Sequence, residues 1–125
     1  MNKLKKLPDA EFSIMMVVWA NEPPVTTNII MQQLGNEREW KAQTVISLML
    51  RLVERGFIRT EKNGKERTYF PLISKEDYLK FETGDFIERF HGNSFASLVA
   101  TLYDGKKIKN SDLDELAEWL KDRRD

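Results

Sequence analysis

The stretch EWKAQTVISLMLRLVERGFI, residues 39–58, decides the fold, because a helical pattern in it is followed at once by a strand pattern. The helix is predicted over Lys41–Arg55, and Gly56 is the residue type best suited to a left-handed helix terminus. Steps of 100° per residue place four apolar side chains within one quadrant of this helix: Val45, Leu48, Met49 and Leu52. Ile46 and Leu50 lie outside that quadrant, so these two apolar side chains are expected to contact a surface other than the core.

Two shorter helices are predicted before this one. Asp9–Ala20 has apolar residues at helical spacing and ends at Asn21-Glu22-Pro23-Pro24, since proline cannot continue a helix. The next helix begins at Thr26 or Thr27, whose hydroxyl can cap the free amides, and runs to Leu34 before Gly35 breaks it.

A hairpin is predicted directly after Gly56. Residues 57–62 and 66–70 have strand character, and Asn63-Gly64 between them is a strong turn signal. Three helices followed by a hairpin form a winged helix, a variant of the helix-turn-helix. We therefore expect a mainly α fold of α+β type, with a winged-helix DNA-binding domain over residues 1–73 and its recognition helix over 41–55.

The exposed side of this recognition helix carries amide, hydroxyl and apolar groups, which match the donors, acceptors and thymine methyl groups of base edges. For Ile46, contact with a thymine methyl and packing against the wing stay equally open; for Leu50, packing is favoured. Cations at the hairpin tip can reach phosphates, and residues at the start of the second helix can bind a phosphate or act only as a cap. The candidate DNA contacts are Thr27, Asn28, Lys41, Gln43, Thr44, Ile46, Ser47, Arg51, Lys62, Lys65 and Arg67.

The second half, residues 74–125, predicts a small helical dimerisation domain. Three amphipathic segments are expected at 74–90, 94–103 and 111–123, the first interrupted by Gly84 and the last capped by Ser111. Three short helices have little volume to bury their apolar residues, so a second copy is expected to cover them, with one compact monomer core as the alternative. The dimerisation candidates are Phe86, Ile87, Phe90, Phe95, Leu98, Leu102, Leu113, Leu116 and Leu120.

Composition argues against an enzyme. The 125 residues include no Cys and a single histidine, His91, so thiolate chemistry and histidine-pair zinc sites are excluded, and no glycine-rich phosphate loop occurs. No metal or cofactor is expected.

The net charge is zero, yet residues 1–73 carry +3 and residues 74–125 carry −3, so the first half is the one that faces an anion. The longest apolar run near the start is too short to span a bilayer, which predicts a cytoplasmic protein without membrane contact.

An ordered set of residues covers nearly the whole chain: Ala10-Glu11-Phe12, Met15, Trp19, Asn28-Ile29-Ile30, Trp40, Thr44-Val45, Leu48, Arg51-Leu52, Gly56-Phe57-Ile58, Phe86-Ile87 and Ser97-Leu98-Val99. In this order they resemble the penicillinase repressor family, the BlaI/MecI-type regulators. The resemblance implies a homodimeric repressor that binds an inverted-repeat operator of double-stranded DNA and controls β-lactam-response genes. Lys41-Ala42-Gln43 and Ile46 depart from the family pattern, which argues against an identical operator.

The resemblance also implies a regulatory protease as a partner. In the family, a zinc protease coupled to an antibiotic sensor cuts an Asn-Phe bond, which aligns here with Asp85-Phe86. Two other functions stay open: a winged helix used as a protein-interaction module, and a repressor that senses a small molecule bound between its two modules.

Overall fold

The computed structural model describes residues 4–124. Contacts divide the chain into two compact units, the first ending at Glu82 and the second beginning at Thr83. The domain boundary expected after residue 73 precedes this division, because Tyr78 and Phe81 pack with the first core. Both boundaries leave the three helices and the hairpin in one unit.

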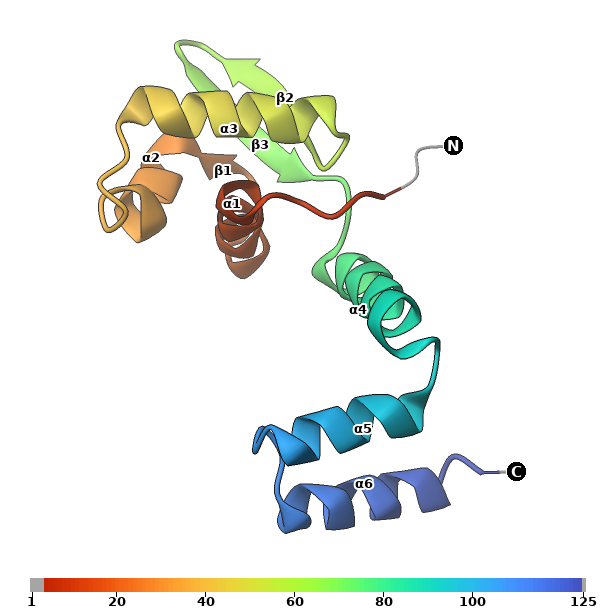
Figure 1. Ribbon diagram of the computed structural model, residues 1–125. Coiled ribbons are helices and arrows are strands. Elements are labelled where there is room, and N and C mark those ends of the chain that lie inside the picture. Colours follow the sequence, from red (N-terminus) through yellow and green to blue (C-terminus); the bar gives the residue numbers. More distant parts are fainter. Residues whose placement is uncertain (1–3, 125) are drawn as a thin grey trace. The chain divides into compact units, whose positions relative to one another are not determined.

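The first unit has the winged-helix order expected from the sequence (Figure 1). Helix α1 (Asp9–Ala20) ends where predicted, and α3 (Ala42–Glu54) is one residue shorter at each end than predicted. Gly56 follows with a φ of 80°, the left-handed conformation expected there. Between these helices lie β1 (Val25–Thr26), α2 (Thr27–Ile30) and η1 (Met31–Gly35), and after them β2 (Ile58–Asn63) and β3 (Glu66–Pro71).

The second helix differs from the prediction at its end. Thr26 caps it as expected, since its hydroxyl accepts a hydrogen bond from the Ile29 amide at 3.2 Å. The helical run ends at Gly35, one residue later than predicted. This glycine is the last residue of η1, a wider π-helical turn that continues α2.

The sheet has three antiparallel strands in the order β1-β3-β2. The hairpin was predicted, but its turn is Gly64-Lys65 rather than Asn63-Gly64, because Asn63 pairs with Glu66. Gly64 has a φ of 68°, which suits the first central position of a type II′ turn. The strand β1 was not predicted. Two residues are too few to show an alternating pattern. The strand β1 forms by pairing with β3, and Val25 lies opposite Tyr69.

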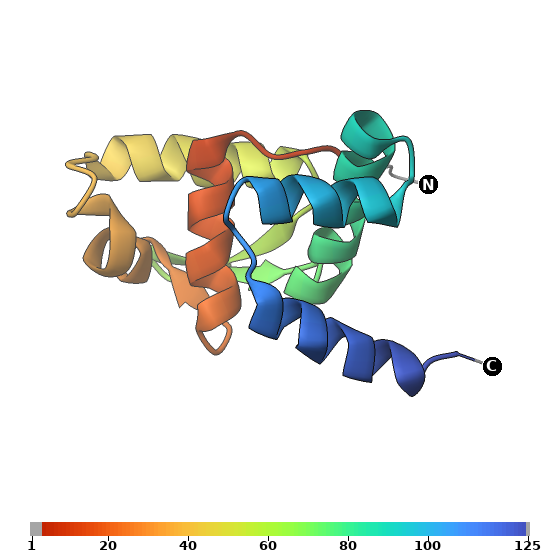
Figure 2. The same ribbon diagram turned by 60° about the horizontal axis from the view of Figure 1, so that its bottom comes forward.

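The core of the first unit lies where α1 packs against α3 and against α2 with η1 (Figure 2). Its members include Ile14, Met15 and Val18 of α1, and Val45, Met49 and Leu52 of α3. Leu48 is half-buried at the edge of this core. The quadrant predicted for the recognition helix is therefore its buried face.

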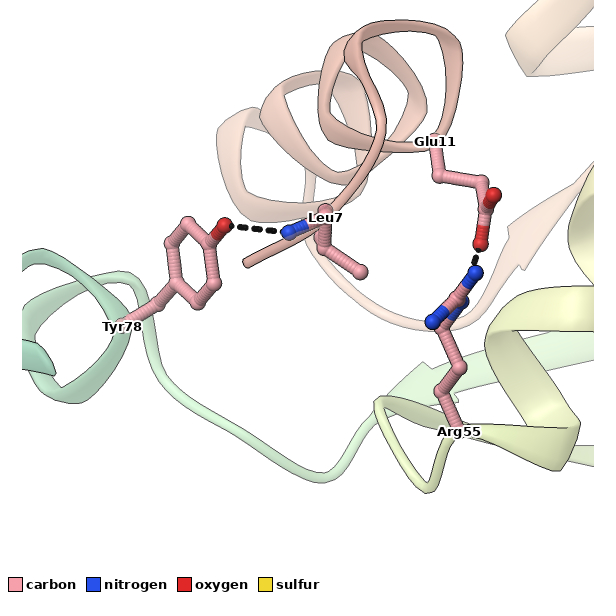
Figure 3. Close-up of polar contacts among 4 residues, drawn as sticks. All are labelled: Leu7, Glu11, Arg55 and Tyr78. Carbon is pink, nitrogen blue, oxygen red and sulfur yellow. Dashed lines mark hydrogen bonds and ion pairs between the residues drawn. The ribbon is translucent and has the colours of Figure 1, made fainter. Parts of the chain in front are cut away.

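Tyr78, in the first turns of α4 (Lys75–His91), joins this helix to the core of the first unit. Its ring lies between 5.5 and 6.0 Å from four other aromatic rings, those of Phe12, Trp19, Phe57 and Phe81. Its hydroxyl accepts a hydrogen bond from the Leu7 amide at 2.8 Å (Figure 3). Burial, with a smaller contribution from the Glu82 carboxylate, raises the pKa of Tyr78 to about 12.

The second unit contains the rest of α4, then α5 (Phe95–Asp104) and α6 (Asn110–Lys121). The expected interruption at Gly84 is wrong, since α4 continues through it. Ser94 caps α5 by accepting from the Ser97 amide at 3.1 Å. The predicted cap Ser111 is also wrong, because α6 begins one residue earlier and the Lys109 amide donates to Asp112 at 2.8 Å. From residue 4 to residue 124, no helix has the length and apolar character needed to cross a membrane.

Candidate nucleic-acid interface

The outer face of α3 is exposed along its length. Gln43, Thr44 and Ser47 present amide and hydroxyl groups to solvent, and Lys41 precedes them at the helix start. Ile46 is 42% exposed and Leu50 is 57% exposed. The packing favoured for Leu50 is therefore wrong, since neither apolar side chain belongs to the core cluster or packs against it. This surface holds hydrogen-bond donors, acceptors and apolar groups together.

A buried ion pair fixes the far end of α3 (Figure 3). The Glu11 side chain of α1 is 1% exposed, and its Oε1 accepts from Nε of Arg55, at the end of α3, at 2.6 Å. A charge-assisted bond of this length restrains both partners. Because Arg55 directly follows the last turn of α3, the pair holds the exposed face at a set angle to α1.

The start of α3 is fixed by Trp40. Its amide donates to the Gly35 carbonyl at 2.8 Å, and its half-buried ring packs against the core. The Arg38 guanidinium lies 5.5 Å from the centre of the ring. The connection between η1 and α3 is thereby held at both of its ends.

Exposed cationic side chains lie both on α3 and on the hairpin wing of the first unit. Lys62, Lys65 and Arg67 are exposed on the hairpin wing, and Arg51 is exposed on α3 itself. Within residues 4–124, none of these four cations, nor Lys41, forms an ion pair. Their charges are therefore free to meet an anion.

The structure brings together two sets of predicted phosphate contacts that the sequence had left separate. Thr27 and Asn28, at the start of α2, line a hollow of about 370 Å³ with Lys65, Glu66 and Arg67 of the wing. Pairing of β1 with β3 brings α2 and the wing together, because α2 directly follows β1. The missed strand is thus the reason that this proximity could not be predicted.

The candidate dimerisation residues lie in a unit without a buried core. Between Thr83 and Arg124, no residue is buried. Phe86, Phe90, Phe95 and Leu120 are exposed, and the other five candidates are half-buried: Ile87, Leu98, Leu102, Leu113 and Leu116. Two further aromatic residues, Tyr103 and Trp119, are 43% and 52% exposed. Both lie in predicted amphipathic segments but were not among the dimerisation candidates.

The candidate cleavage bond, Asp85-Phe86, lies inside α4. Asp85 forms an ion pair one turn along the helix with Arg89, at 3.4 Å. Phe86 is 47% exposed, and its ring lies 4.9 Å from that of Phe90. The bond is therefore near the surface but held in helical geometry. In the part of the chain that the structure describes, no group of three or more His, Asp or Glu residues could hold a metal ion.

The fold and this exposed helix face define the class of protein: a winged-helix domain followed by a helical module. The family model described as "Penicillinase repressor" matches residues 7–122, so the chain belongs to the penicillinase repressor family. The family inferred from the ordered residue set is thereby confirmed.

Relatives match over almost the full length. The penicillinase repressor of Bacillus licheniformis is 26% identical over 99% of this chain and 96% of its own. The methicillin resistance regulatory protein MecI of Staphylococcus aureus (strain N315) is 28% identical over 95% of this chain and 96% of its own.

Two solved structures resemble the winged-helix part. The solution structure of the DNA-binding domain of the repressor BlaI is 31% identical, with a TM-score of 0.54, and the match covers 62% of this chain and 94% of that one. The monomeric form of Bacillus licheniformis BlaI in complex with the blaP half-operator is also 31% identical, with a TM-score of 0.51 and the same coverage.

Proposed function

We propose that this chain is a transcriptional repressor that binds an inverted-repeat operator as a homodimer. The observation that carries the proposal is the outer face of α3, where amide, hydroxyl and apolar groups are exposed beside Lys41 and Arg51, which form no ion pair within residues 4–124. A recognition helix needs this combination, because cations position the protein on phosphates while the helix reads base edges. The similar BlaI structure with a half-operator supports DNA as the partner.

The proposed roles follow from the geometry. Gln43, Thr44, Ile46 and Ser47 enter the major groove, with Lys41 and Arg51 beside them. Lys62, Lys65 and Arg67 contact phosphates from the wing. Thr27 and Asn28 contact phosphates near those reached by the wing, since they line one hollow with Lys65 and Arg67. Binding to operator DNA supports a cytoplasmic location, and membership of the family supports β-lactam-response genes as targets.

The proposed dimer rests on the lack of buried residues between Thr83 and Arg124. A helical module without a buried residue lacks the apolar burial that stabilises a fold. A second copy related by a two-fold axis would cover the exposed aromatic residues and place two α3 helices on symmetric half-sites.

The test is a selection of bound sequences from a random DNA pool, followed by the mass of the complex at two salt concentrations. We expect an inverted repeat bound by two chains, with affinity that falls steeply as salt rises, because phosphate binding releases counterions. Recovery of no sequence, with a dimer present in solution, would contradict DNA binding and favour a protein-interaction module.

The dimer has its own test. Phe90→Ser, at a side chain that is 62% exposed in the second unit, should shift the chain towards monomer at micromolar concentration. Leu72→Ser, at a side chain that is 55% exposed in the first unit, is the matched control and should leave the mass unchanged. Equal masses for both variants and the native chain would contradict an interface at Phe90.

A further inference from the structure

We propose that Ile46 reads the 5-methyl group of a thymine in the major groove, an inference that rests on the DNA-binding function proposed above. The side chain is 42% exposed on the outer face of α3, where the polar Gln43 lies one turn before it and the apolar Leu50 one turn after it. It lies in the second turn of α3, and helix-turn-helix proteins contact bases from the N-terminal part of the recognition helix. Its position therefore places an apolar branched group where base edges are read.

The core of the first unit does not need this side chain. Val45, Met49 and Leu52 of the same helix are fully buried and complete the packing against α1, whereas Ile46 is absent from that cluster and from the residues packed on it. A single exposed apolar residue is common on proteins and needs no explanation. Here Ile46 shares α3 with the exposed Arg51 and follows the exposed Lys41, neither of which forms an ion pair within residues 4–124, and those charges favour a polyanion as the occupant.

The chemistry of isoleucine selects thymine among the bases. In the major groove, thymine alone presents a methyl group, while guanine, adenine and cytosine present hydrogen-bond donors or acceptors. An aliphatic side chain offers no hydrogen-bonding group, so against those edges it would leave buried polar atoms unpaired. Against a methyl group it removes apolar surface from water without that cost.

Leu50 provides a matched comparison on the same face. It is also exposed and apolar, but it lies one turn further along α3, away from the helix start. The two side chains thus differ in their position along the helix more than in their chemistry. A reading role that depends on the N-terminal position belongs to Ile46.

The experiment removes single methyl groups from the DNA. In one half-site of the selected operator, each thymine is replaced in turn by deoxyuracil, which lacks only the 5-methyl group, and the Kd is measured for the native full-length chain. Burial of one methyl-sized group corresponds to a roughly fourfold change in affinity. We expect one position at which the replacement weakens native binding by about that factor.

The same replacements are then measured with three variants. Ile46→Ala should lose the sensitivity at that position, Ile46→Val should keep most of it, and Leu50→Ala should keep all of it. Because Ile46 lies outside the core, the Ala variant should melt at the same temperature as the native chain. Operator binding by the native chain that no deoxyuracil weakens would overturn the inference, as would an Ile46→Ala variant with unchanged sensitivity. A native chain that selects no DNA sequence would overturn the proposed function and this inference together.

Discussion

Gln43 differs from its apolar neighbours on α3, because its amide both donates and accepts hydrogen bonds. This pair of groups matches the N6 and N7 edge of adenine, so Gln43→Ala should cost about 1–3 kcal/mol at one base position and little elsewhere. Binding to operators with each base pair changed in turn measures this cost. Gln33→Ala is the control, since that amide is bound to Asn21 and lies outside α3. An equal loss at every position would contradict a base-reading role.

Arg55 and Glu11 test how strongly the buried pair holds α3. Arg55→Ala leaves the Glu11 carboxylate, which is 1% exposed, without its partner. Breaking a buried pair on one side typically costs about 3–5 kcal/mol, and the partial exposure of Arg55 places this loss near the lower limit. Urea unfolding at neutral pH measures it. Lys80→Ala breaks the exposed pair with Glu76 and should cost below about 0.5 kcal/mol. Similar losses for the two variants would contradict the role of the buried pair.

Single residues were predictable to unequal degrees. The buried quadrant of α3 followed from periodicity, because helix geometry alone fixes which side chains share a face. The pairing of Glu11 with Arg55 did not follow, since a glutamate in the first turn of a helix is usually solvated and its partner is 44 positions away. The exposure of Leu50 could not be predicted either, because it depends on whether another element packs against this side chain, and the local sequence does not contain that information.

Among the elements, the hairpin wing is predicted to bind DNA without reading its sequence. Lys65→Ala removes an exposed charge beside the hollow at the start of α2. We expect weaker binding to all sequences alike and a salt dependence whose slope falls by about 1. Titrations at several salt concentrations, with operator and unrelated DNA, provide both quantities. Lys121→Ala in α6 is the control. A loss confined to one base position would contradict the phosphate assignment.

Tyr78, in the first turns of α4, should lower the free energy of unfolding as the pH rises above 10. Burial raises the pKa of Tyr78 from its ordinary value of 10.0 to about 12. The folded state therefore retains a proton that the unfolded state releases, so this contribution is full below pH 10 and is lost as the pH rises towards 12. The total loss should be about 2–3 kcal/mol. Urea unfolding from pH 8 to pH 12 measures it, and Tyr78→Phe, which has no ionisable group, should lack this part of the slope. Parallel curves for the two proteins would contradict the assignment.

Elements with strong local patterns were predicted, and those that depend on distant contacts were missed. The ranges of α1 and α3 followed from apolar spacing, and the hairpin followed from its glycine turn. The two-residue strand β1 exists only because β3 pairs with it, and that partner lies more than forty positions away. At Gly84 an interruption was predicted, but α4 continues through this residue. Among the described residues, no atom outside its own helix lies within 4 Å of the position that a Cβ would take.

For the whole molecule, we propose that the bond Asp85-Phe86 is a site of regulatory cleavage, as the family resemblance implies. The bond Asp85-Phe86 lies within α4, so a protease needs local opening of the helix before it can cut. Asp85→Asn creates the Asn-Phe pair that the resemblance implies as the cleavage site, and it removes the ion pair with Arg89. Incubation with a zinc protease of the family's antibiotic-sensing systems should therefore cut the variant faster than the native chain, with fragments ending at residue 85 by mass. Absence of any cut in both proteins would end the proposal that this bond is a control point.

The second unit was predicted as three amphipathic segments, and the structure places the end of α4, α5 and α6 there, with no buried residue between Thr83 and Arg124. In the proposed dimer, the folded fraction of this unit would depend on how often two copies meet. The number of molecules in the cell would then set both the order of this unit and the occupancy of the operator. When most chains are monomers, the dimer concentration falls with the square of the chain concentration, so halving the supply would then lower the occupancy of an unsaturated operator by more than half.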